Sequence, residues 1–289
     1  NDPIYQQDSD FEVFIDADES THFYKEFEVN ALNTVWNLML DKPYADGGNE
    51  HSGRVAQPGD PLYYDVVGQE SAVQVLEGSV NAFAPTKWSI EIAMSYKDML
   101  AHSMNNGVAP TASTRWRINF SRVERKGDIN WTWQPQIEWN AGEHAYQGEV
   151  NMHLPNAWGY LVFGEEIEDE TKEVGTTVSA EQSEHDPQWS IRMAAMSVYA
   201  AQHAYRDKNG SFTSDFSAIQ QWVDMELLDD VSMGRVMMHA PTPDTFEAII
   251  HSRDYEASIQ QDRLLLVQAI MPPPEDGLSS DKSGTLLER

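Results

Sequence analysis

The sequence predicts a mainly β protein, in which an antiparallel β-sandwich is followed by a small α+β domain. From residue 8 to about residue 164, apolar and polar residues alternate with a period of two, and turn clusters such as "NNGVAPTAST" separate the runs. A polar, acidic stretch comes next. Beyond it, a helical pattern precedes apolar runs of strand length. These observations together favour two structural units.

Six strands are predicted in the first unit, each with one hydrophobic face. A single open sheet could not cover that face, so the strands favour a sandwich. The predicted strands span 11–16, 23–40 with a bend at Asn33, 72–76, 88–94, 116–124 and 157–163, and a short helix spans 95–103.

The second unit begins with a helix that Pro187 opens and Asn209-Gly210 ends. A second helix is expected at about 215–224, and "TFEAIIHS" and "DRLLLVQAIM" are expected to pair as strands. The predicted organisation is therefore a sandwich at 1–164, an acidic linker at 165–186, an α+β domain at 187–271 and a disordered tail at 272–289.

The charge of the chain excludes some classes of partner. Its 289 residues include 47 acidic and 19 basic side chains, a formal net charge of −28. Nucleic acid and anionic membrane surfaces would be repelled. No apolar run approaches the roughly 20 residues of a membrane-spanning helix, so no such segment is expected. Cysteine is absent, and the chain starts without an initiator Met, as a processed mature chain or a fragment would.

Carboxylates gather on one face of the first two predicted strands. In "DSDFEVFIDADESTHFYKEFEVN", Glu12 alternates with apolar residues in the first strand, and Glu26 and Glu28 do so in the second. Such a face could bind sugar hydroxyls together with Asn30 and Asn119, or it could be a solvated outer face. It could also form ion pairs with arginines.

Paired carboxylates are also compatible with a catalytic function. Two of Glu12, Glu28 and Glu91 could act as the acid and the nucleophile of a glycoside hydrolase. Close carboxylates raise one another's pKa, so we expect an arginine beside them, with Arg117 and Arg122 as the candidates. The motifs G-x-S-x-G, G-x-x-x-x-G-K and H-E-x-x-H do not occur.

Tryptophan is frequent, with nine in the chain. Trp131, Trp133 and Trp139 fall in a predicted long loop with polar neighbours, where they could stack on sugar rings or pack under the loop. The segment "DADESTHFYKE" offers Asp16, Asp18 and Glu19 as oxygen donors for calcium, although it lacks the Gly and terminal Glu of an EF-hand and could be a solvated acidic turn.

Several segments resemble the carbohydrate-binding module family 9-like domain. They are "DSDFEVFID", "FYKEFEVNALNTVWNLMLDKPYADGG", "WSIEIAMSYKDM", "WRINFSRVE" and "NMHLPNAWGYLVF", and the resemblance covers about residues 5–164. It implies a β-sandwich that binds sugars, usually in secreted bacterial proteins concerned with polysaccharide use. Glu12 matches a sugar-binding Glu of the family, whereas Glu28 stands where the family has an arginine and Tyr5 or Gln6 stands where it has a tryptophan. The second clamp tryptophan has no clear match around Met152 and His153.

The sequence therefore predicts non-catalytic carbohydrate binding by a secreted, cell-surface or periplasmic protein. A glycoside hydrolase and an acidic docking module are the alternatives, and calcium is the one cofactor considered. The predicted ligand contacts are Tyr5, Glu12, Glu28, Asn30, Arg117, Asn119, Trp131, Trp133 and Trp139.

Overall fold

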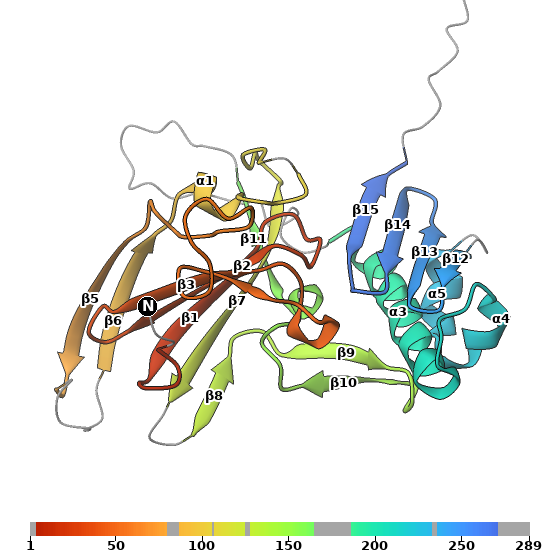
Figure 1. The fold of residues 1–289 in the computed structure, drawn as a ribbon, viewed down its shortest axis with the longest axis horizontal. Coiled ribbons are helices and arrows are strands. Elements are labelled where there is room, and N and C mark those ends of the chain that lie inside the picture. The colour runs from red at the N-terminus through yellow and green to blue at the C-terminus, as the bar shows by residue number, and fades with distance from the viewer. Residues whose placement is uncertain are drawn as a thin grey trace, which may run out of the picture.

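The computed structural model describes residues 4–79, 87–105, 107–124, 128–164, 186–232 and 236–270. It is mainly β, with antiparallel sheets and a few helices toward the C-terminus, as the sequence predicts (Figure 1).

A seven-stranded antiparallel sheet forms the centre of the N-terminal part, in the order β11-β7-β1-β2-β3-β4, with β8 paired to β7. The hairpins β5–β6 and β9–β10 form two separate two-stranded sheets. The strands are β1 (Asp10–Asp16), β2 (Tyr24–Asn30), β3 (Val35–Leu40), β4 (Glu50–His51), β5 (Glu70–Glu77), β6 (Lys87–Ala93), β7 (Arg115–Glu124), β8 (Ile129–Thr132), β9 (Gln136–Asn140), β10 (Ala145–Glu149) and β11 (Gly159–Val162). The short helices are η1 (Tyr44–Asp46), α1 (Tyr96–Met99) and η2 (Pro155–Ala157).

Hydrophobic clusters cover both faces of the central sheet. On one face, Val13, Phe27 and their neighbours pack against Val73 of β5 and Ile90 of β6, which makes the sandwich. On the other face, a second cluster contains Phe14 and Trp158 together with Ile4, Tyr24, Trp36, Leu38 and Leu40. Strand β2 is consequently buried along its whole length.

The segment 23–40 is a hairpin and not one bent strand. Strands β2 and β3 pair antiparallel through a tight turn in which Asn33 has φ 60°. The Oδ1 atom of Asn30 accepts hydrogen bonds from the amides of Leu32 (3.0 Å) and Thr34 (2.9 Å). An asparagine side chain thus fixes the turn without glycine or proline.

The C-terminal part is a four-stranded antiparallel sheet, in the order β12-β13-β14-β15, that packs on one long helix. The two strands predicted to pair with each other, β13 and β15, both pair with β14 between them. Its elements are α3 (Trp189–Asn209), α4 (Phe216–Ile219), η3 (Gln220–Trp222), α5 (Met225–Val231), β12 (Val236–Thr242), β13 (Thr245–His251), β14 (Tyr255–Gln260) and β15 (Leu265–Ala269).

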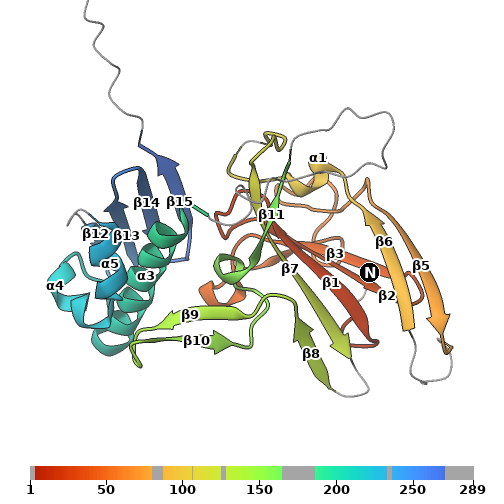
Figure 2. The same cartoon turned by 180° about the vertical axis from the view of Figure 1, so that it is seen from behind.

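The two parts meet along α3 and the β14–β15 turn. Figure 2 shows the β9–β10 hairpin extending from the sandwich to α3. There the indole Nε1 of Trp139 donates to the Trp222 carbonyl at 2.8 Å, and the hydroxyl of Tyr146 donates to Asp224 Oδ2 at 2.9 Å. The hairpin therefore ties the sandwich to the helical side of the second part.

In the described part of the chain, no helix combines the length and the apolar character that a membrane crossing requires. The predicted linker at 165–186 and tail at 272–289 lie outside the described residues, apart from Asp186.

Candidate functional site

The predicted carboxylate face exists, and strand register aligns it. Glu12 of β1 lies directly opposite Glu28 of β2 and, on its other side, Ser121 of β7. Asp10, two residues before Glu12, points to the same side. We call Asp10, Glu12 and Glu28 the carboxylate patch.

The carboxylate patch is buried. Glu12 is 5% exposed, Asp10 1% and Glu28 0%, so the solvated outer face considered from the sequence is wrong. The N-terminal segment closes over it, because the amides of Ile4 and Tyr5 donate to Glu28 Oε2 at 3.1 and 3.2 Å. A sugar has no evident access to these carboxylates.

Burial changes the proton affinity of the carboxylate patch. It raises the pKa of Asp10 to about 9, with the charges of Glu12 and Glu28 adding to the shift. Burial likewise raises the pKa of Glu28 to about 8 and that of Glu12 to about 7. The pKa of neighbouring Glu26 is also raised, chiefly by burial.

The arginine expected beside these carboxylates is not found among the described residues. Arg117 Nε instead lies 3.0 Å from Glu19, and its Nη2 lies 3.7 Å from Asp186. Arg122 pairs with Glu124 at 2.8 Å. These two arginines therefore pair with other acidic residues, and neither of them offsets the negative charge of the carboxylate patch.

The two predicted asparagine contacts have structural partners. Asn30 donates from Nδ2 to Asp8 at 3.0 Å and fixes the β2–β3 turn. Asn119 is fully buried, donates to the Gln134 carbonyl at 3.1 Å and accepts from the Gln134 amide at 3.0 Å. Tyr5, by contrast, is 38% exposed and stacks on Trp36.

The three predicted stacking tryptophans do not gather. They lie on or beside strands β8 and β9 and not in a long loop, because Trp131 is in β8, Trp139 is in β9 and Trp133 lies between the two strands. Trp131 and Trp133 are 61% and 55% exposed, whereas Trp139 is engaged at the interface with the C-terminal part.

In the acidic loop predicted to bind calcium, the carboxylate oxygens accept hydrogen bonds or form ion pairs within the protein. Asp16 accepts from the amides of Asp18 and Thr21, and Asp18 accepts from the Ser20 amide. Glu19 lies between Arg117 and Arg192, with Arg192 Nη2 at 3.2 Å. The arrangement explains the loop's conformation without an ion, and calcium binding there stays a prediction.

The alternative catalytic set is only partly assembled. Glu12 and Glu28 lie together, but Glu91 is an exposed residue of β6 in a different sheet. A glycosidase needs two carboxyls on either side of an accessible glycosidic bond. Glu12 and Glu28 are adjacent but buried, so the set lacks that access.

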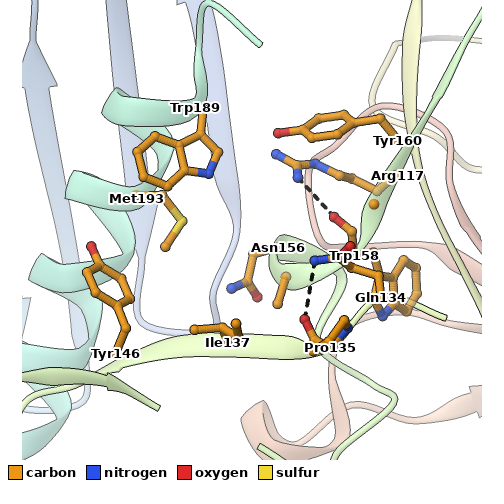
Figure 3. A pocket seen from close by; sticks show the side chains of 12 residues that line it. Arg117, Gln134, Pro135, Ile137, Tyr146, Asn156, Trp158, Tyr160, Trp189 and Met193 are labelled. Carbon is orange, nitrogen blue, oxygen red and sulfur yellow. Dashed lines mark hydrogen bonds between the residues drawn. The ribbon is translucent and has the colours of Figure 1, made fainter. Parts of the chain in front are cut away.

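A cavity of about 330 Å³ opens between the sandwich and α3 (Figure 3). Trp189 projects from α3 toward Arg117 and Tyr160 on the sandwich side, and Met193 of the same helix is directed toward Ile137. The remaining lining residues are Gln134, Pro135, Ile137, Tyr146, Asn156, Ala157, Trp158 and Gly159.

Aromatic rings and polar groups are interleaved around this cavity. The Arg117 guanidinium lies 4.0 Å from the centre of the Tyr160 ring and donates from Nη1 to the Trp158 carbonyl at 3.2 Å. Trp189 is 44% exposed and Tyr146 39% exposed, so both present ring surface to solvent. The cavity volume lies near the lower end of the range, about 300–1,000 Å³, that small-molecule sites occupy.

Of the ligand residues predicted from the sequence, only Arg117 lines the cavity. Trp189 belongs to the apolar stripe of the predicted helix, and this pattern indicates packing. One feature of the sequence does indicate that Trp189 could line a cavity: it is a large aromatic residue in the first turn of the helix, directly after the acidic stretch.

Comparison of the chain with protein-family models gave no match, and comparisons with curated proteins and with solved structures gave none either. The carbohydrate-binding resemblance therefore remains a prediction, and the site is argued from its geometry.

Proposed function

We propose that this protein binds a small neutral carbohydrate, without cleaving it, in the cavity between the sandwich and α3. The observation that carries the proposal is the cavity wall itself, where the rings of Trp189, Tyr146 and Tyr160 alternate with the polar groups of Gln134 and Arg117. Flat aromatic faces stack on the apolar faces of sugar rings, and amide and guanidinium groups bond hydroxyls.

The charges around the cavity favour a neutral ligand. Arg117 is already paired with Glu19 and Asp186, so it brings little net positive charge to the cavity wall. The chain as a whole carries a formal charge of −28, which would repel acidic polysaccharides.

A non-catalytic role agrees with the lining of the cavity. None of the described residues that line it is Asp or Glu. The usual glycosidase mechanisms require two carboxyl groups beside the scissile bond. The hydrolase alternative is thus disfavoured at this site.

The test is a glycan array at two salt concentrations, followed by titration calorimetry with any retained mono- or disaccharide. We expect Trp189→Ala to weaken binding by roughly tenfold or more, which corresponds to about 1.4 kcal/mol. Gln134→Ala, which removes a rim amide, should weaken it less. Trp131→Ala is the matched control, because Trp131 is an equally large exposed ring outside the cavity.

Three outcomes would contradict the proposal. Equal binding by the Trp189→Ala and wild-type proteins would move the site elsewhere. New reducing ends in the bound sample would indicate hydrolysis. Absence of glycan retention, with salt-sensitive capture of basic proteins, would favour the docking role.

A further inference from the structure

We propose that the carboxylate patch of Asp10, Glu12 and Glu28 binds a divalent cation, and that this cation is Ca²⁺. The three side chains each offer one carboxylate oxygen, and these three oxygens all lie within 4.8 Å of one another. This proposal does not depend on carbohydrate binding, because the patch is not part of the cavity between the sandwich and α3.

The backbone holds the three carboxylates together. Asp10 and Glu12 alternate on β1, and Glu28 is the direct register partner of Glu12 on β2. All three strand positions lie near the centre of the seven-stranded sheet, because β1 is paired on both sides. The convergence of the carboxylates therefore follows from register, not from flexible side chains that happen to meet.

Unsatisfied oxygens point to a missing partner. Asp10 is 1% exposed, and neither of its carboxylate oxygens forms a hydrogen bond of ordinary length and angle. Glu28 is fully buried; its Oε2 accepts from two backbone amides, its Oε1 accepts from no N–H or hydroxyl group among the described residues, and its carboxyl shares a hydrogen bond with that of Glu26. Buried polar groups are normally hydrogen-bonded, and buried charges are paired or coordinate metals.

Protein cations do not supply the missing charge in the described residues. The ion pairs of Arg117 and Arg122 go to other acids, and Lys25 donates to the Phe23 carbonyl at 2.5 Å. Asp10, Glu12 and Glu28 form no ion pair there. A bound dication would offset two of the three negative charges that these carboxylates carry when they are deprotonated.

The donor atoms select the class of metal. All three are carboxylate oxygens, with no histidine or cysteine in the group, and such sets suit hard cations over zinc or copper. The hydroxyl of Ser121, opposite Glu12 on β7, is a further oxygen at this position. Ca²⁺ accepts a variable number of oxygens in irregular geometry, whereas Mg²⁺ requires a near-octahedral set, so three clustered carboxylates favour Ca²⁺.

The experiment uses the full chain after chelation and buffer exchange. Its thermal unfolding midpoint and calorimetric titration are measured with CaCl₂ and, separately, with MgCl₂. We expect CaCl₂ to raise the midpoint and to bind at least tenfold more tightly than MgCl₂. Asp10→Asn keeps the shape of the side chain and an oxygen that can still accept from the Val123 amide, so it should fold and bind Ca²⁺ at least tenfold more weakly.

Two further variants make the result decisive. Glu12→Gln should weaken Ca²⁺ binding as Asp10→Asn does, whereas Glu91→Gln, an exposed carboxylate of another sheet, should bind as the wild type. The proposal is overturned if the chelated wild-type protein shows neither a Ca²⁺-dependent midpoint nor a heat of binding. It is also overturned if Asp10→Asn and Glu12→Gln bind Ca²⁺ as tightly as Glu91→Gln does. Preference for Mg²⁺ would overturn the assignment of the ion.

Discussion

Replacing Arg263 by Met should destabilise the protein by about 3–5 kcal/mol, the usual cost of removing one partner of a buried ion pair. Arg263 lies in the turn between β14 and β15 and is 6% exposed. Its Nε donates to Asp46 Oδ2 at 2.8 Å, and its Nη1 donates to Glu138. Its guanidinium also covers the Tyr199 ring at 4.6 Å.

The size of the effect comes from what the substitution leaves behind. The Asp46 side chain is 1% exposed and that of Glu138 19%, so water cannot fully replace the lost guanidinium. Methionine retains much of the apolar contact with Tyr199. Most of the loss should therefore come from two uncompensated carboxylates, and not from a cavity.

Urea unfolding at pH 7 measures this loss, and Arg206→Met is the control. Arg206 pairs with Asp244, whose side chain is 73% exposed, so its replacement should cost less than about 1 kcal/mol. Adding Asp46→Asn to Arg263→Met should recover part of the loss, because one buried charge is then gone. An Arg263→Met protein as stable as Arg206→Met would refute this account of the interface.

Three other outcomes are expected. Burial lowers the pKa of His153 to about 4, so the folded state resists protonation below the ordinary pKa of 6.5. The contribution of neutral His153 to the free energy of unfolding is complete above pH 6.5. It is lost as the pH falls toward 4, by at most about 3 kcal/mol. His153→Gln should remove this part of the pH dependence, as measured by urea unfolding. Gly48→Ala should cost about 2 kcal/mol or more, measured in the same way, because its Cβ would lie 1.9 Å from the Lys42 carbonyl oxygen. Asn119→Ala should cost about 1–3 kcal/mol because it leaves the Gln134 amide without its acceptor, and an unchanged unfolding midpoint would contradict that role.

The sequence predicted strands best where alternation is strong. Phe11, Val13 and Ile15 alternate with Glu12, and β1 forms there. The sequence predicts a loop at β8, because the alternation of Ile129 and Trp131 with Asn130 and Thr132 spans only four residues with polar neighbours. The sequence predicts one bent strand in place of the β2–β3 hairpin, because an asparagine, not glycine or proline, holds the turn. Strand β14, with the sequence "YEASIQ", is not predicted from the sequence because it lacks a long apolar run, although Ala257 and Ile259 are fully buried.

Alternation also predicted which side of the sheet carries Glu12 and Glu28, but it could not predict what covers that side. The cover comes from Ile4 and Tyr5, near the start of the chain, and from the hydrophobic cluster around Trp158. The cavity was beyond sequence reasoning for a related reason. Its wall combines residues from β7 to α3 that approach one another only when the second part docks on the sandwich.

This difference in construction makes the two proposed sites separable. The carboxylate patch is built from neighbouring strands of one sheet, so loosening the interface should leave Ca²⁺ binding intact. The cavity instead has Trp189 on one side and Tyr160 on the other, and the Arg263 ion pairs hold those sides together. In buffer without urea, where the Arg263→Met protein remains folded, calorimetry should therefore show weaker saccharide binding. Its Ca²⁺ affinity should stay within twofold of that of the wild type. Equal loss at both sites would mean that the sandwich itself depends on the docked helix, and the separation argued from strand register would fail.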